Sequence, residues 1–434
     1  MTAAARGLAV ALALVAAAMA VPALTGWNVR VRSFPPLHAE WAPRIGAGTV
    51  PALVLALLAA RYAVDLAERL PWRALTAAVF AAGLAWMLSL ALVDGADGIG
   101  HILETPYEYL RTARNVTDVH QLLQEFVSRI PYSSTPKPNW AVHVAGHPPG
   151  ALLFFVGLDR VGLGGGLAAG MVVTAIAATT AVALLLTVRT LGDEANARRA
   201  APFLVFAPAA VWQAVSADAM FAAVAAWALA ALALAGTRRS AAWAAAAGLL
   251  LGACVMLSYG LLLLGVLALT VVALGRWWPS LPLAALATLA VVGAFAALGF
   301  SYLDALPVLR ERYFDGVGGR RPASYWTWGG LAALAISAGP LAGAGMAHLI
   351  GVGRASLRDM STRTVAALAA AASASVLIAD ATQMSKAEVE RIWLPFVPWI
   401  LLSCALLPEG WRRRGLLLQL AVALAVQHLL ATGW

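Results

Sequence analysis

Hydrophobic positions in this chain are gathered into long runs that recur from one end of the sequence to the other. A run of about 20 apolar residues forms a helix long enough to cross ~30 Å of hydrocarbon. Barrel strands would instead need polar and apolar residues to alternate, and the sequence has no such alternation. The pattern predicts an all-α polytopic membrane protein with about 13 transmembrane helices. We expect these helices at 7–25, 48–65, 73–93, 167–188, 200–214, 218–236, 240–257, 260–275, 280–300, 329–350, 364–380, 393–407 and 415–432.

Two segments carry patterns that differ from a full span. Residues 149–158 (PGALLFFVGL) are apolar, but Asp159 and Arg160 follow them, so only about ten residues are uncharged, too few to cross. We interpret this segment as a re-entrant or interfacial half-helix, because proline fits the first turn of a helix. Over residues 116–130, apolar side chains fall on one helical face and polar side chains on the other. That spacing predicts an amphipathic helix on the outer membrane surface.

The distribution of charge sets the expected orientation of the helices. The chain is 62% hydrophobic and 12% charged, with a net charge of +9. In a soluble protein this charge would suggest a nucleic-acid partner, but here the arginines cluster in short loops, which is typical of loops facing the cytoplasm. Such loops lie around residues 61–73, 189–199 and 412–414. We therefore expect no nucleic-acid partner and a single transmembrane domain over residues 1–434. The segments expected outside, where they would form the active site, are 94–166, 301–328 and 381–392.

Polar residues that could carry chemistry gather in these outer segments. Asp94 and Asp97 follow the third span, where a carboxylate could act as a general base, although aspartate before glycine is also common in plain turns. His143 and His147 are four residues apart and could share a helix face to hold a phosphate, an acceptor or a metal ion. No HExxH pattern or third ligand accompanies the two histidines, so we assign no metal ligands.

Further polar residues lie near the outer ends of later spans. Asp218 opens the span at 218–236 and could contact a substrate, or could simply be favoured by the helix dipole. Glu388 and Arg391, in the segment SKAEVERIWLPF, could belong to a site or could form an ion pair on a helix surface. The segment 301–328 adds Arg320, Arg321 and Tyr325.

Taken in order, these features resemble the GT-C superfamily of integral membrane glycosyltransferases. Members such as protein mannosyltransferases and aminoarabinose transferases often show HPP before a short membrane segment, and this chain has HPPG at 147–150. Its segment GDEANARRAAPFLVFAPAAVWQAVSADAMFA is similar to their basic loop followed by an SP…D segment, and KAEVERIWLPFVPW is similar to their E-R-Y/W-L-x-x-P segment. The whole is similar to actinobacterial integral membrane proteins of that superfamily. The chain departs in two ways: an additional span precedes the loop at residue 94, and the usual acidic pair is replaced by DGAD. The choice between Asp94 and Asp97 therefore stays open.

The resemblance implies an inverting glycosyltransferase in the cell membrane, with an active site on the extracytoplasmic face. Such an enzyme takes a sugar from a polyprenyl-phosphate donor and moves it to a hydroxyl of a glycan, glycolipid or protein acceptor during cell-envelope assembly. Asp94 or Asp97 would then be the catalytic base. No cofactor is assigned, although a divalent metal ion would be compatible. The implied substrate-binding residues are His143, His147, Asp218, Arg320, Arg321, Tyr325, Glu388 and Arg391.

Two other functions are compatible with an apolar bundle of helices. A transporter or flippase of lipids or glycans would place polar residues deep inside the spans and would break helices in matched halves of the chain. The predicted spans are almost free of charge and the polar residues gather on one side, which disfavours transport. A non-catalytic subunit with the GT-C shape would share every feature above, so only an activity measurement separates it from an enzyme.

Overall fold

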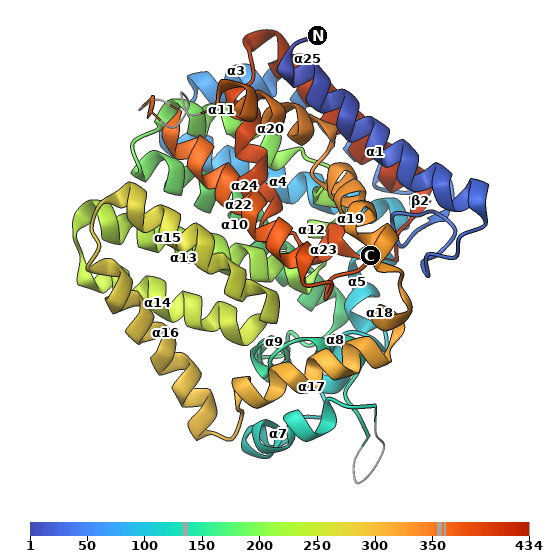
Figure 1. Ribbon diagram of the computed structural model, residues 1–434, viewed down its shortest axis with the longest axis vertical. Helices are drawn as coiled ribbons and strands as arrows, with labels where there is room; N and C mark the ends of the chain where they lie inside the picture. The colour runs from blue at the N-terminus through green and yellow to red at the C-terminus, as the bar shows by residue number, and fades with distance from the viewer. Residues whose placement is uncertain (133–137, 354–357, 360–361, 434) are drawn as a thin grey trace.

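The computed structural model describes residues 1–132, 138–353, 358–359 and 362–433, and most of this part of the chain is helical (Figure 1). Within those residues, the one sheet is an antiparallel pair of two-residue strands, β1 (Glu40–Trp41) and β2 (Leu430–Ala431). Glu40 pairs with Ala431 and Trp41 pairs with Leu430, so the loop after the first helix is joined to the end of the last one. The all-α class expected from the sequence is confirmed.

Seven helical stretches in the described residues are long and apolar enough to cross a membrane. They are α1 (Ala3–Thr25); α2 (Thr49–Leu58), continued by η1 (Ala59–Ala63) and α3 (Val64–Arg69); α4 (Trp72–Ala91), continued by η2 (Leu92–Asp94); α10 (Gly166–Thr190); α13 (Ala217–Arg238); α16 (Ser280–Ala297); and α22 (Arg363–Ala381). An eighth candidate is the pair α19 (Ala323–Ser337) and α20 (Pro340–Val352), which are bent at 105° to each other. These helices define a helical membrane protein, whereas the expected number of about 13 spans is not confirmed.

The other predicted spans fall on helices that are shorter or that begin with charged residues. The short apolar ones are α14 (Ala241–Leu257), η5 (Tyr259–Leu263) with α15 (Leu264–Gly275), and α24 (Val397–Leu401) with η6 (Leu402–Leu406). The last helix, α25 (Glu409–Leu429), is long, but its first turns contain three consecutive arginines.

Two predicted spans are broken at proline. The segment expected at 200–214 consists of α11 (Glu194–Val205) and the short α12 (Ala210–Gln213), with Pro208 between them. The segment expected at 329–350 contains the bend between α19 and α20, where Gly339 adopts a φ of 80° before Pro340. Proline has no backbone N–H to donate to a helix, and glycine tolerates a positive φ, so both breaks follow from local sequence.

The segments expected outside form short helices. They are α5 (Asp97–Gly100), η3 (Ile102–Glu104), α6 (Leu110–Ala113), α7 (Val119–Glu125), η4 (Val127–Arg129), α8 (Val142–Gly146), α9 (Pro149–Arg160), α17 (Tyr302–Asp315), α18 (Val317–Arg320) and α23 (Val389–Ile392). Residues 133–137 of the first of these segments lie outside the described part of the chain. The expected amphipathic pattern over 116–130 is confirmed by α7 and η4, because Leu122, Leu123 and Phe126 are buried while Gln121 and Gln124 are exposed.

The short apolar helix predicted after the HPPG motif is α9. It begins at Pro149, directly after Pro148, and ends at Arg160, so it contains 12 residues. A helix of this length extends only about 18 Å, which is less than the thickness of a bilayer core. Its first turn lies against the end of α14, where a Cβ atom on Gly150 would be 2.5 Å from the Met256 carbonyl oxygen. The helix is therefore fixed in place by a close backbone contact that only glycine allows.

Loops that the charge distribution assigns to the same side come together. Near α3 and α11, Arg198 donates to the carbonyl oxygen of Leu70 at 2.8 Å, and Arg412 pairs with Glu68 at 2.5 Å. These two helices lie at the top of Figure 1, whereas α7 and α17 lie at the bottom. At the lower end, Arg312 of α17 donates to the carbonyl oxygen of Trp140 at 3.1 Å. The arginine-rich loops and the outer segments thus form two separate groups.

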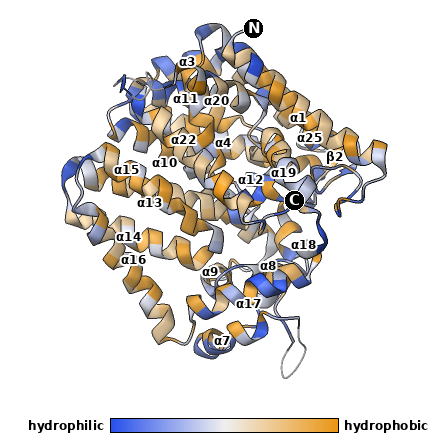
Figure 2. Cartoon of the chain, in the orientation of Figure 1, coloured by the Kyte–Doolittle hydropathy of each residue, from blue (hydrophilic) through white to orange (hydrophobic). Residues whose placement is uncertain are grey.

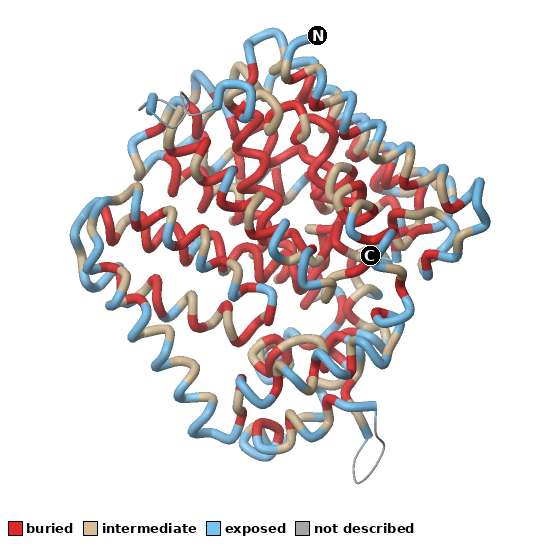
Figure 3. Tube along the Cα trace, in the orientation of Figure 1, coloured by how far each residue is buried: buried red, intermediate tan, exposed pale blue. Residues whose placement is uncertain are grey.

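Buried residues concentrate in the middle of the bundle, where α10, α13 and α11 meet (Figure 3). The outer surface of the helices is also mainly hydrophobic, and hydrophilic residues gather at the loops and around α17 and α18 (Figure 2). Helix α16 is the extreme case, since it is apolar and yet only two of its residues, Ser280 and Ala284, are buried. An apolar exterior of this kind is suited to contact with lipid rather than with water.

Candidate functional site

A group of buried ionisable side chains surrounds Arg391 of α23. We call it the charged cluster, and it consists of Glu108, His143, His147, Asp218, Arg321, Lys386, Glu388 and Arg391. These residues come from five separate parts of the chain: the loop before α6, helix α8 and its end, the first turn of α13, the end of α18 and the segment that enters α23. The structure therefore brings together residues nearly 300 positions apart in the sequence, so the cluster is formed by tertiary contacts and is not a local ion pair.

Arg391 is the centre of the cluster. Its guanidinium pairs with Asp218 of α13, lies 3.5 Å from a carboxylate oxygen of Glu388 and lies 3.5 Å from Nε2 of His143. The arginine is only 5% exposed and Asp218 only 4%. Burial alone would lower the pKa of Arg391, but the carboxylates of Asp218 and Glu388 raise it. The side chain is therefore a permanently charged group held inside the protein by acidic partners.

Glu388 lies between two arginines. One of its carboxylate oxygens is 3.1 Å from Arg321, and the other is 3.5 Å from Arg391. Burial would raise the pKa of Glu388, but Arg391 and Arg321 outweigh it and hold the pKa at about 2. Arg321 also donates to the backbone carbonyl of Lys386 at 2.6 Å, and the Lys386 ammonium donates to the carbonyl of Arg321 at 3.1 Å. These reciprocal contacts join the segment 301–328 to the segment 381–392.

The two histidines face different partners. His143 Nδ1 lies 2.7 Å from the carboxylate of Glu108, and both side chains are buried. His147 Nδ1 lies 2.8 Å from the carbonyl oxygen of His143 and 2.9 Å from the hydroxyl oxygen of Tyr109. Its Nε2 lies 3.8 Å from Asp218. His143 therefore extends the cluster to Glu108, and His147 extends it from the HPPG motif toward Asp218.

The described residues contain no group of three or more His, Cys, Asp or Glu side chains arranged to hold a metal ion. The histidines are each engaged by a carboxylate or a carbonyl, and the carboxylates are each engaged by an arginine or a histidine. This arrangement places fixed positive charge next to imidazole groups, in a site that is largely shielded from water. Such a site can bind an anion if one of the internal carboxylates gives up its arginine partner.

Glu390 belongs to the same short helix as Arg391 but lies outside this network. It is 0% exposed, and neither carboxyl oxygen makes a hydrogen bond within the described residues. Burial raises its pKa to about 7, and the negative charge of Glu388 acts in the same direction. A buried carboxyl without partners is costly when charged, so Glu390 differs sharply from its neighbour Glu388.

The structure brings some of the sequence-predicted site residues together and leaves others apart. His143, His147, Asp218, Arg321, Glu388 and Arg391 all belong to the charged cluster. Arg320 is exposed at the end of α18. Tyr325 is buried, and its hydroxyl donates to the carbonyl oxygen of Ala18 at 2.8 Å, so here it holds α19 against α1.

The two aspartates proposed as the base have no hydrogen bond or ion pair to the cluster in the described structure. Asp94 pairs with Arg44 and accepts a hydrogen bond from Gln427 at 2.8 Å. Asp97 opens α5 with its side chain exposed. The loop after the third span is thus tied through Asp94 to the loop after α1 and to α25.

One member of the charged cluster was missed by sequence reasoning, and one buried carboxyl beside the cluster was not distinguished from its neighbour. Glu108 lies in the stretch ETPYEYL, which matches no motif, and its role is visible only from its contact with His143. Glu390 is part of the segment KAEVERIWLPFVPW, but nothing in that segment distinguishes its carboxyl from that of Glu388. The only available signal for Glu108 was its charge in an otherwise hydrophobic and aromatic stretch.

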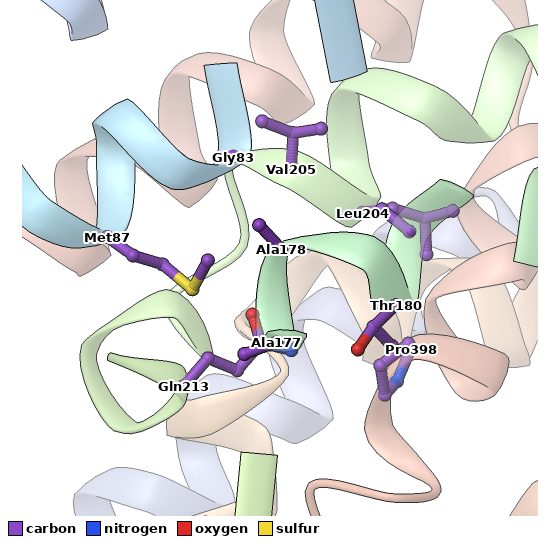
Figure 4. A pocket seen from close by; sticks show the side chains of 10 residues that line it. Gly83, Met87, Ala177, Ala178, Thr180, Leu204, Val205, Gln213 and Pro398 are labelled. Carbon is purple, nitrogen blue, oxygen red and sulfur yellow. The ribbon is translucent and has the colours of Figure 1, made fainter. Parts of the chain in front are cut away.

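A small cavity lies elsewhere in the bundle, between α4, α10, α11 and α24 (Figure 4). Its volume is about 20 Å³, and most of its lining is apolar. The hydroxyl of Thr180 lines it and has no hydrogen-bond partner among the residues that the structure describes, and Gln213 adds a second polar side chain. This is room for a single water molecule and not for a sugar. No residue of the charged cluster lines it, so the cavity is not the candidate site.

No protein-family model matches this chain, and no curated protein matches it. The fold and the site define a helical membrane protein in which buried ionisable residues surround one arginine.

Proposed function

We propose that this protein is a membrane glycosyltransferase that moves a sugar from a polyprenyl-phosphate donor to an acceptor hydroxyl on the extracytoplasmic face. The observation that supports this proposal best is the charged cluster, in which Arg391 and Arg321 both contact Glu388 and Arg391 also lies beside His143. A departing lipid phosphate needs fixed positive charge, and guanidinium groups match the geometry of phosphate oxygens. The cluster is built from outer segments and from the first turn of α13. A lipid-linked donor would need that position, with its phosphate near the loops and its chain among the helices.

The proposed reaction is a single displacement that inverts the anomeric carbon. The acceptor oxygen attacks this carbon, the bond between the carbon and the phosphate oxygen breaks, and the phosphate leaves with the bonding electrons. The proton of the acceptor hydroxyl passes to a carboxylate acting as general base. Following the resemblance to the GT-C superfamily, we assign this role to Asp94 or Asp97. Arg391 and Arg321 would stabilise the leaving phosphate.

The direct test is transfer of radiolabelled sugar. Purified protein in liposomes would be incubated with polyprenyl-phosphate mannose, arabinose or glucose and with a membrane extract as acceptor. We expect one of the three labels to move to an acceptor. Arg391→Lys keeps the positive charge but loses the forked donor geometry, so it should impair transfer while leaving Asp218 with a cationic partner. Removing the charge altogether would leave Asp218 buried and unpaired, which makes Arg391→Ala prone to unfolding.

The alternatives give different results in the same experiment. Movement of an unchanged labelled donor from one leaflet to the other would indicate a flippase. Binding of the donors without any transfer would indicate a non-catalytic subunit with the same shape. Either result would refute the proposed enzyme.

A further inference from the structure

The carboxylate of Glu388 occupies the space between two buried guanidinium groups. It lies 3.1 Å from Arg321 and 3.5 Å from Arg391, and both arginine side chains are 6% exposed. Two arginines placed so that one anionic group contacts both is the arrangement that proteins use to bind a phosphate. In this structure, the anionic group is supplied by the chain itself.

The charges of the cluster are balanced without a ligand. The cations Arg321, Lys386 and Arg391 are matched by the carboxylates of Glu108, Asp218 and Glu388 when the histidines are neutral. An incoming phosphate would therefore add negative charge with no partner, unless one carboxylate moves away. Glu388 is the carboxylate best placed to move, because its side chain is 22% exposed, whereas those of Asp218 and Glu108 are 6% and 5% exposed.

The backbone at this position is also unusual. Ala387 and Glu388 have φ angles of 64° and 59°, in the left-handed region that residues other than glycine rarely adopt. Glu388 is the residue before the first turn of α23, yet its side chain makes no hydrogen bond to the helix amides. The carboxylate is therefore not used to cap the helix, and the strained segment would not lose a helix cap if the side chain turned outward.

We propose that Arg321 and Arg391 form a phosphate-binding site that Glu388 fills in the absence of ligand, and that the phosphate of a lipid donor displaces the Glu388 carboxylate. This inference rests on the proposed function for the nature of the ligand. It adds where the phosphate binds and that the Glu388 carboxylate must move away to admit it. While the site is empty of ligand, Glu388 prevents two buried cations from lying side by side without an anion. When the phosphate enters, its oxygens replace those of the carboxylate, and no covalent bond changes.

The test is the affinity of the full chain for polyprenyl phosphate without a sugar, measured in detergent by titration. Glu388→Gln and Glu388→Ala both remove the competing charge, so both should bind polyprenyl phosphate at least about tenfold more tightly than wild type. The two arginines stabilise the Glu388 carboxylate, as its lowered pKa indicates, so an incoming phosphate must compete with this carboxylate in the wild type. Glu311→Gln is the matched control, because Glu311 is exposed on α17 and should leave the affinity unchanged.

Arg321→Lys provides the second part of the test. It should weaken binding of polyprenyl phosphate. In the Arg321→Lys background, Glu388→Gln should increase the affinity by a smaller factor than it does in the wild type, because the two residues share one site. If Glu388 merely orients the two arginines, both Glu388 variants should bind polyprenyl phosphate more weakly than the wild type. Weaker or unchanged binding in both Glu388 variants, in protein whose melting temperature shows that it is folded, would overturn the proposal.

Inorganic phosphate is titrated alongside to identify the source of the phosphate group. Tighter binding of polyprenyl phosphate by the Glu388 variants supports the proposal. A smaller increase in their affinity for inorganic phosphate would show that the lipid chain contributes to binding. Tightening for inorganic phosphate alone would overturn the assignment to a lipid donor. The outcome is independent of the transfer assay. Tighter binding without sugar transfer refutes the glycosyltransferase and keeps the site, whereas transfer with unchanged binding refutes the site and keeps the enzyme.

Discussion

At the scale of single residues, two acids in one short segment behave in opposite ways. Glu388 is flanked by Arg321 and Arg391, and its pKa is held at about 2, although burial acts in the other direction. Glu390, two residues later, is fully buried and has no arginine partner, so burial raises its pKa to about 7. The difference follows from the direction in which each side chain leaves the chain, since a charged neighbour within a few ångströms outweighs desolvation.

Glu390 makes stability depend on pH. Its pKa is higher in the folded protein than its usual value of 4.5, so the folded state binds the proton more tightly than the unfolded chain does. The stability contributed by the protonated carboxyl is present below pH 4.5 and is lost as the pH rises to about 7. We expect the melting temperature in detergent to fall over this interval, and Glu390→Gln to reduce that fall. Glu311→Gln should behave as wild type. If the melting temperature of Glu390→Gln falls with pH as steeply as that of the wild type, Glu390 is not the group responsible.

The base of the proposed reaction also belongs to the residue scale. General-base assistance contributes typically ~10²–10⁴-fold, so Asp94→Asn should lower the turnover by about that factor. Donor affinity should stay nearly unchanged, because the carboxylate acts on the acceptor. The ion pair of Asp94 with Arg44 makes a folding control necessary, and asparagine can still accept the hydrogen bond from Gln427.

The exposed Asp97 is tested in parallel. Loss of turnover only in Asp97→Asn would transfer the role of base to Asp97. Normal turnover in both single variants would refute the mechanism, whatever the outcome at Glu388.

At the scale of helices, small residues decide which helices pack. A Cβ atom on Gly7 of α1 would overlap the carbonyl oxygen of Gly343 and the methyl group of Ala347, both on α20. Helices in lipid gain little from burying apolar surface against each other, so close backbone contact of this kind supplies much of the packing. Gly150 plays the same part where α9 meets α14.

Gly7→Val should therefore separate α1 from α20. Overpacking a close contact costs typically about 1–3 kcal/mol, so we expect a lower melting temperature and faster proteolysis of the purified protein. The matched control is Gly83→Ala in α4, because a Cβ atom there meets nothing within 4 Å. Equal stability of Gly7→Val and the wild type would show that α1 does not rely on this contact.

At the scale of the whole molecule, the expected orientation can be tested at two exposed alanines. The outer segments meet one another, and the arginine-rich loops meet one another, as a consistent topology requires. A cysteine replacing Ala96 should react with a membrane-impermeant maleimide from outside, and one replacing Ala195 only after the membrane is opened. The two native cysteines, Cys254 and Cys404, are buried, so the background should be low. Labelling of the Ala96 variant only from the cytoplasm would reverse the topology.

The sequence by itself determined the helical class, the positions of the long apolar helices and the short helix after HPPG. These follow from local rules: a chain in lipid must satisfy its backbone hydrogen bonds internally, and proline and glycine mark where helices start or break. Pro149 and the charges at Asp159 and Arg160 were enough to predict α9. The sequence also pointed to Arg391, Asp218 and the two histidines as polar residues at the edge of the membrane, each with a structural alternative.

Only the tertiary structure decided which of these residues share a site. His143, Asp218 and Arg391 meet although they are far apart in the chain, and Glu108 joins them without belonging to any motif. The same folding engages Asp94 with Arg44 and sets Tyr325 against α1. Periodicity along a helix reports only which face of that helix is apolar. An ion pair between distant residues depends on how whole helices and loops pack, and that information is not contained in any single stretch of sequence.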